Sequence, residues 1–197
     1  MKKITLPILI LITTTLFYSC FINPFYKEKD LINVPVTGKW LQMNDTTIEE
    51  MPFSARIWDI RQTKDKEYTI SRQVTERERQ KYIAHFFKIK GDLFADVILL
   101  SAGYHHIDSS THSLCKIRLK GNKMEVSMLN KDYLDECIKS NKYHLTHTVS
   151  NDYQSDGVGS GGMIFYTASA DELQNFIREN DSDKKLFYET LVLVKSQ

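Results

Sequence analysis

The sequence lacks an excess of charge of either sign. Its 197 residues carry 26 lysines and arginines against 25 aspartates and glutamates, a formal net charge of +1. A protein that binds nucleic acid without strong sequence preference needs a basic footprint on its surface. The charge balance therefore argues against nucleic acid as a partner.

Cysteine is scarce, and the three cysteines, Cys20, Cys115 and Cys137, include no C-x-x-C pair. A zinc knuckle or a thioredoxin-type redox site consequently has no support. Cys115 and Cys137 are consistent with one disulfide or with two separate buried thiols. We expect both to face the core, Cys115 from a strand and Cys137 from a short helix.

Catalytic motifs are absent as well. No H-E-x-x-H pattern occurs. The stretch Gly-Val-Gly-Ser-Gly-Gly at residues 157–162 lacks the strand-to-helix frame of a nucleophile elbow and the lysine of a P-loop. We therefore expect no catalytic residue, no cofactor and no resident metal, and a binding protein is favoured over an enzyme.

Only one long apolar run is present, and it opens the chain. Lys2 and Lys3 precede a nearly continuous apolar stretch over residues 4–18, which Ser19 and Cys20 close. This run is too short to span a bilayer, and it has the length and flanking charge of the apolar region of a signal peptide. No second run approaches membrane length.

A small residue directly before a cysteine, placed after an apolar run, resembles the lipobox of bacterial lipoprotein precursors. The resemblance implies that residues 1–19 are removed and that Cys20 is diacylated through its sulfur. Two acyl chains hold a protein stably in a bilayer, at about 0.8 kcal/mol per buried methylene. We accordingly expect a protein of the bacterial cell envelope, anchored through Cys20 to a membrane, with the outer membrane favoured.

The remaining chain divides into a connection and one domain. Pro24 and Pro35 limit regular structure over residues 20–35, which we expect to form a lipidated tether. Residues 36–197 are expected to form a single β-rich domain. The expected strands lie at residues 38–43, 56–74 (two strands around the turn 64–66), 81–90, 93–100, 112–120, 123–128, 143–149, 163–167 and 186–194.

Two hairpins are the clearest local predictions. Gly91-Asp92 is a two-residue turn signal that pairs Ile89 with Phe94 and leaves both faces of its strands apolar. Gly121-Asn122 joins two strands with clean alternation between apolar and charged residues, and it places Arg118 opposite Glu125. We expect short helices over residues 130–141 and after a capping box at residues 169–172.

These elements predict a mainly β, antiparallel fold with short helices, in the form of a closed or half-open barrel, with an α+β sandwich as the alternative. Gly38, Lys39 and Trp40 in the first strand resemble the G-x-W signature of lipocalins, a family in which bacterial members are often lipoproteins. The resemblance implies a barrel followed by a helix and a last strand. It also implies Trp40 at the closed end and binding of a small ligand. The last strand lacks the arginine that the family has nearby.

Inward-pointing aromatic residues and one polar pair are the candidates to line a ligand. His85 and Asp96 are diagonal neighbours in the expected register and would mark the polar end of an apolar cavity. Such a pair can act as acid and base or can satisfy its own hydrogen bonds. The full candidate set is Trp40, Trp58, His85, Phe87, Phe94 and Asp96. The glycine-rich residues 151–162 are expected to form a mobile loop near one mouth.

The leading hypothesis is a cell-envelope lipoprotein that binds either a small apolar ligand or an envelope protein partner, without catalysis. One alternative is an envelope hydrolase that depends on His85 and Asp96 or on a metal. For the metal, the available ligands are Asp108 and the other histidines: His105, His106, His112, His144 and His147. A second alternative is a structural or inhibitory envelope protein without a pocket.

Overall fold

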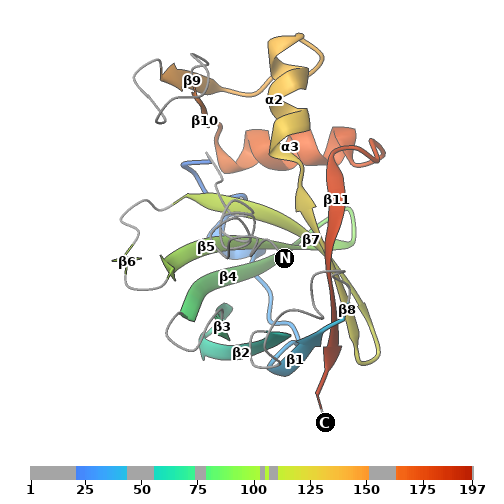
Figure 1. Ribbon diagram of the computed structural model, residues 1–197. Helices are drawn as coiled ribbons and strands as arrows, with labels where there is room; N and C mark the ends of the chain where they lie inside the picture. Colours follow the sequence, from blue (N-terminus) through green and yellow to red (C-terminus); the bar gives the residue numbers. More distant parts are fainter. Residues whose placement is uncertain are drawn as a thin grey trace, which may run out of the picture.

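The computed structural model describes residues 21–43, 56–73, 79–102, 105–106, 111–150 and 163–196. Within them the chain forms a closed antiparallel barrel of eight strands, with short helices against its outer wall (Figure 1). The strands are β1 (Gly38–Gln42), β2 (Ile57–Lys64), β3 (Glu67–Gln73), β4 (Arg79–Ile89), β5 (Asp92–Ala102), β7 (His112–Lys120), β8 (Lys123–Leu129) and β11 (Phe187–Lys195). Pairing of β1 with β11 closes the ring. The expected barrel is confirmed, and the sandwich alternative is wrong.

The β7–β8 hairpin shows how alternation builds the inner wall. Gly121 has a φ of 60° at the first turn position, as a type II′ turn requires. Arg118 consequently lies opposite Glu125, as predicted. The alternate residues of this hairpin are buried in the barrel: Cys115, Ile117, Met124, Val126 and Met128.

The β4–β5 hairpin corrects the predicted register. Its two turn residues are Lys90 and Gly91, with φ of 50° and 89°, so Ile89 pairs with Asp92 instead of Phe94. A type I′ turn needs positive φ at both central residues, and a glycine at the second position suits it better than the expected Gly91-Asp92 pair. The correction places His85 directly opposite Asp96.

The same hairpin also corrects which apolar face points inward. Residues predicted for the barrel interior, Phe87 and Phe94, lie outside it in a cluster with the helices. The opposite face fills the barrel with Tyr82, Ala84, Phe86, Ala95 and Val97. Alternation sorts the residues into two sets, but it cannot tell which of two apolar sets faces the interior. Which set faces inward is decided by the helices and the N-terminal segment that pack on the outer wall.

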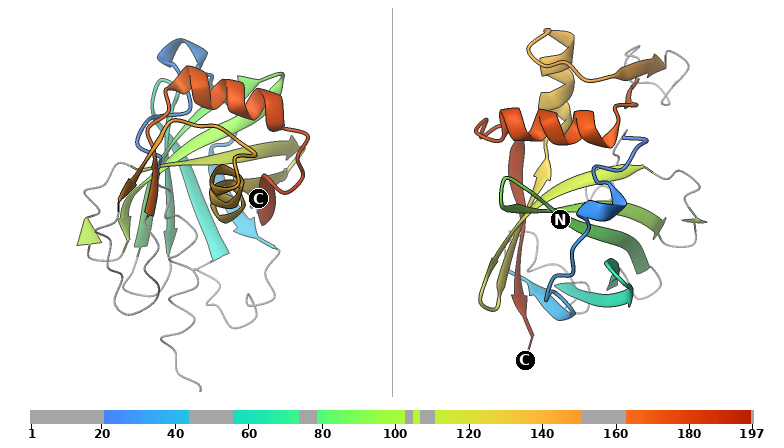
Figure 2. Two further views of the ribbon diagram at one scale, coloured as in Figure 1. Left: turned by 90° about the horizontal axis from the view of Figure 1, so that it is seen from above. Right: turned by 180° about the vertical axis from the view of Figure 1, so that it is seen from behind.

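Helix α3 (Ala170–Asn180) lies across this outer wall, and α2 (Lys131–Lys139) stands beside α3 and projects away from the barrel (Figure 2). Asn130 caps α2 by accepting a hydrogen bond from the backbone N–H of Tyr133. Ser169 likewise caps α3 by accepting from the N–H of Glu172. Both helix starts are confirmed. In the expected capping box the Glu172 carboxylate would accept a hydrogen bond from the Ser169 N–H. It accepts one from the Thr146 N–H instead, at 2.6 Å.

The remaining elements are small. They are the 3-10 helix η2 (Glu28–Asp30), β6 (His105–His106), and a separate hairpin of β9 (His147–Ser150) with β10 (Met163–Tyr166). The strand expected over residues 143–149 starts only at His147, because Tyr143 and Leu145 are buried against the helices instead. Among the described helices, none combines the length and apolar character needed to cross a bilayer.

Residues 21–36, which we call the strap, correct the expected tether over residues 20–35. Phe21 is 2% exposed and Val36 is 0% exposed, so both belong to the cores. The Tyr68 hydroxyl accepts a hydrogen bond from the N–H of Val34 at 2.7 Å and donates to its carbonyl at 3.0 Å. The strap holds only the short 3-10 helix η2 as regular structure, but several of its apolar residues are buried, so it is part of the domain.

The two internal cysteines are free and buried. Cys115 lies on the inner wall of the barrel, and Cys137 lies on α2 under the helical layer. The prediction that both face the core is confirmed. Of the two alternatives, the pair of separate thiols is the one observed. Burial raises the pKa of Cys115 to about 12, which disfavours its reactive thiolate.

Candidate functional site

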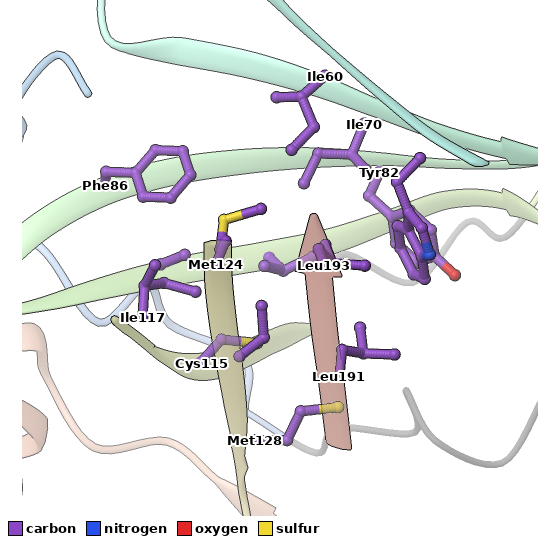
Figure 3. A pocket seen from close by; sticks show the side chains of 14 residues that line it. Ile60, Ile70, Tyr82, Phe86, Cys115, Ile117, Met124, Met128, Leu191 and Leu193 are labelled. Atoms are coloured by element: carbon purple, nitrogen blue, oxygen red, sulfur yellow. The ribbon is translucent and has the colours of Figure 1, made fainter. Parts of the chain in front are cut away.

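The barrel encloses an apolar cavity of about 60 Å³ (Figure 3). Side chains from seven of the barrel strands line it: Trp58, Ile60, Ile70, Tyr82, Phe86, Ala95, Val97, Cys115, Ile117, Met124, Val126, Met128, Leu191 and Leu193. A water molecule needs about 10–15 Å³, whereas drug-sized ligands occupy sites of roughly 300–1,000 Å³. The cavity as it stands therefore has room for a short alkyl segment.

One end of the barrel is lined by polar side chains. At this end, which we call the mouth, the strands begin or end at Gln42, Ile57, Gln73, Arg79, Ala102 and His112. The arrowheads of β1, β3 and β5 point toward the same side in the left view of Figure 2. Buried polar side chains of the inner wall collect here, beside the rings of Trp58 and Tyr82: Gln42, Arg72 and Gln80.

These mouth residues form an ordered network. Trp58 Nε1 donates to Gln42 Oε1 at 3.1 Å, and the Tyr82 hydroxyl donates to Gln80 Oε1 at 2.8 Å. The Arg72 guanidinium lies 5.0 Å from the centre of the Trp58 ring. Burial raises the pKa of Tyr82, against the opposing effect of Arg72, so its hydroxyl stays a neutral donor. A positive charge and amide groups thus border the apolar cavity.

The opposite end of the barrel is closed by the strap. Trp40 Nε1 donates to the Val36 carbonyl at 2.7 Å, and Lys195 Nζ lies 5.6 Å from the Trp40 ring centre. Gly38 has a φ of 123°, and a Cβ there would lie 3.2 Å from Lys195 Cε, so the position requires glycine.

The structure separates the six residues expected to line a ligand. Trp58 lines the cavity, whereas Trp40 is buried in the same barrel core without bordering it. Phe87 and Phe94 stack 6.0 Å apart on the outer wall. The network of Gln42, Arg72 and Gln80 was missed, because polar residues near strand ends are typical of solvated loops in a single sequence.

Asp96 and His85 also lie on the outer wall, and they do not form the expected pair. The fully buried Asp96 carboxylate accepts a hydrogen bond from the N–H of Phe25 at 3.2 Å, and its Oδ2 lies 2.8 Å from His112 Nδ1. His85 Nδ1 has no hydrogen-bond partner, and its Nε2 lies 3.9 Å from Glu67 Oε2. Finding His112 from the sequence would have required the β5–β7 register, which places Ile98 opposite it.

The Asp96–His112 pair therefore holds the strap against the barrel. The strap's Phe21 also accepts a hydrogen bond from the His112 N–H at 2.9 Å. A buried polar pair whose hydrogen bonds are satisfied is a structural device more often than a catalytic one. Within the described ranges, no three His, Cys, Asp or Glu side chains gather in a way that could hold a metal ion.

Several predicted features lie outside the described residues. They are the lipidation residue Cys20, Asp108, the side chains of His105 and His106, and the glycine-rich residues 151–162. Comparisons with models of protein families, with curated proteins and with solved structures find no match to this chain.

Proposed function

We propose that this protein is a lipid-anchored binding module of the bacterial cell envelope, whose barrel takes up a small apolar ligand with a polar end. The observation that carries the proposal is the closed barrel with a wholly apolar cavity next to a buried polar mouth. The apolar end of the ligand enters the cavity. Its polar end then meets Arg72 and the two glutamines.

The cavity must widen for a ligand longer than a few carbon atoms. Engineered apolar cavities of about 150 Å³ accept benzene, which is more than twice the volume present here. Met124 and Met128 line the wall, and the unbranched methionine side chain adapts readily to an irregular partner. Slender alkyl chains therefore fit the proposal better than rigid rings.

Titration with decanoate, a slender amphiphile, tests this function. We expect saturable shifts of the Met124 and Met128 methyl resonances, together with a change in Trp58 fluorescence. The variant Ala95→Leu fills the cavity and should weaken binding at least several-fold. Overpacking costs about 1–3 kcal/mol, so its fold is checked by thermal unfolding.

The matched control is Ile83→Phe, which adds bulk to the outer face of the neighbouring strand β4 and should leave binding unchanged. Absence of saturable shifts in the wild-type protein would contradict the ligand proposal. An envelope protein partner would then be the better candidate, for which the exposed Val149 of β9 and Tyr188 of β11 offer contacts.

A further inference from the structure

Phe21, the first residue that the structure describes, is held firmly in place at the mouth. Phe21 is buried, its ring lies 4.5 Å from that of Tyr166, and its carbonyl is bound by the N–H of His112, the first residue of β7. The next residue, Ile22, donates its N–H to the Tyr166 carbonyl at 3.0 Å. Cys20 is thus one Cα–Cα step, about 3.8 Å, from a residue fixed on two strands.

The same end of the barrel carries exposed apolar side chains. Ile22 is 49% exposed beside Phe21, Met43 is 57% exposed after the last residue of β1, and Leu100 is 37% exposed near the end of β5. Single exposed apolar residues are ordinary, but these three come from three segments that each end at this side of the barrel. They can enter the interfacial layer of a bilayer.

Two cations stand at the same end. Arg79 and Lys81 are exposed at the start of β4, and neither takes part in an ion pair with another residue of the described ranges. Each basic residue near an anionic membrane contributes roughly 1 kcal/mol of attraction. A surface with apolar tips and cations at its rim suits a lipid headgroup layer better than a protein interface, whose buried centre is depleted of charge.

We propose that the mouth of the barrel rests directly on the bilayer, through Ile22, Met43 and Leu100 with Arg79 and Lys81 at its rim. This inference depends on the proposed acylation of Cys20. An anchor one residue from Phe21 reaches the membrane only if this end of the domain lies at the membrane surface. The ligand then enters the barrel from the bilayer and not from the surrounding water.

The test uses the acylated full-length mature chain in vesicles of phosphatidylcholine and phosphatidylglycerol that contain a headgroup-quencher lipid. A fluorophore is attached at Met43→Cys or Lys81→Cys at the mouth, or at Asn122→Cys in the turn at the opposite end. The native Cys115 and Cys137 are buried and do not compete for the label. We expect quenching several-fold stronger at positions 43 and 81 than at position 122.

A spacer variant provides the matched control. About 12 Gly and Ser residues inserted between Cys20 and Phe21 span about 20 Å and should reduce the difference between the two ends. Equal quenching at all three positions, or stronger quenching at position 122, would overturn the proposal. So would the absence of quenching in acylated protein, because the mouth would then face another partner.

The failures of the two proposals are distinguishable. An unmodified Cys20 thiol, detected by intact mass, removes the anchor and this orientation together, but it leaves the decanoate titration unaffected. An acylated protein that binds decanoate and is quenched equally at both ends loses only the orientation.

Discussion

Titratable groups gather on the outer wall beneath the strap. Asp96 and His112 face each other there, with His85, Tyr26 and Glu67 nearby. Burial, and secondarily Asp96 and Glu67, raise the pKa of Tyr26 to about 12. Burial lowers the pKa of His85 despite the opposing effects of Asp96 and Glu67, with His112 acting in the same direction as burial. Protonation of His85 therefore favours the unfolded chain over the folded one.

The expected pH dependence follows from that direction. Between its lowered folded-state pKa and its ordinary value of about 6.5, His85 binds more protons in the unfolded chain, so the free energy of unfolding falls as pH falls through this window. Replacing His85→Gln should flatten this decline. Urea unfolding of both proteins between about pH 7 and pH 5 measures the difference in slope.

The exposed His144 provides the control. His144→Gln, made at an exposed position, tests whether the change from histidine to glutamine alone alters the slope. A His85→Gln variant with the wild-type slope would contradict the assigned direction.

Among the elements, the strap decides the integrity of the barrel. It closes the end opposite the mouth through Tyr68 and Val36, and it continues along the outer wall to Phe21. Its backbone also bonds β4, because the Ile32 N–H donates to the Phe86 carbonyl at 2.9 Å. A segment whose regular structure is limited to the short helix η2 is thus held to the barrel by individual hydrogen bonds.

Removal of the Tyr68 hydroxyl should loosen this segment. Tyr68→Phe leaves the buried N–H and carbonyl of Val34 without their side-chain partner, which should cost about 1–3 kcal/mol in the free energy of unfolding. Urea unfolding measures the loss, and hydrogen exchange at the Val34 amide should rise with it. Tyr188→Phe, at a residue that is 37% exposed, should change stability by less than about 0.5 kcal/mol. Equal effects of the two variants would contradict the role of the strap.

At the scale of the whole molecule, the helices lie on one side of the barrel (Figures 1 and 2). The strap closes one end, and the buried side chains of Gln42, Arg72 and Gln80 make the other end polar. The helices and the strap cover the outer wall of β4, β5 and β7 through the cluster of Phe87, Phe94 and Leu114. The mouth is the end at which the predicted anchor joins the domain. The predicted anchor and the proposed ligand site consequently lie at the same end of the barrel.

Loss of the anchor should change the location of the protein and spare its fold. Cys20→Ser removes the sulfur that is predicted to carry the lipid, so we expect a soluble protein or an unprocessed precursor. Membrane fractionation and intact-mass analysis measure this outcome. Cys137→Ser, in the buried face of α2, should leave the protein in the membrane fraction. Retention of the Cys20→Ser variant in the membrane, or a free Cys20 thiol in the native protein, would contradict the prediction.

Local chemistry in the sequence determined the elements of this protein. Alternation in β7 and β8, the glycine at Gly121 and the caps at Asn130 and Ser169 act over a few residues, so they could be recognised without the fold. Trp58 was correctly placed on an inward face because its strand alternates cleanly. The barrel class followed from the number and order of such strands.

Only the tertiary structure decided which side of an all-apolar hairpin is inside, and with it the places of Phe87 and Phe94. It likewise brought His112 to Asp96 and drew the strap into the core. It also gathered Gln42, Arg72 and Gln80 from three separate strands at the mouth. Each of these outcomes depends on contacts between segments far apart in the chain. The free energy that favours these contacts comes from burial and hydrogen bonding between distant segments, which no local sequence pattern encodes.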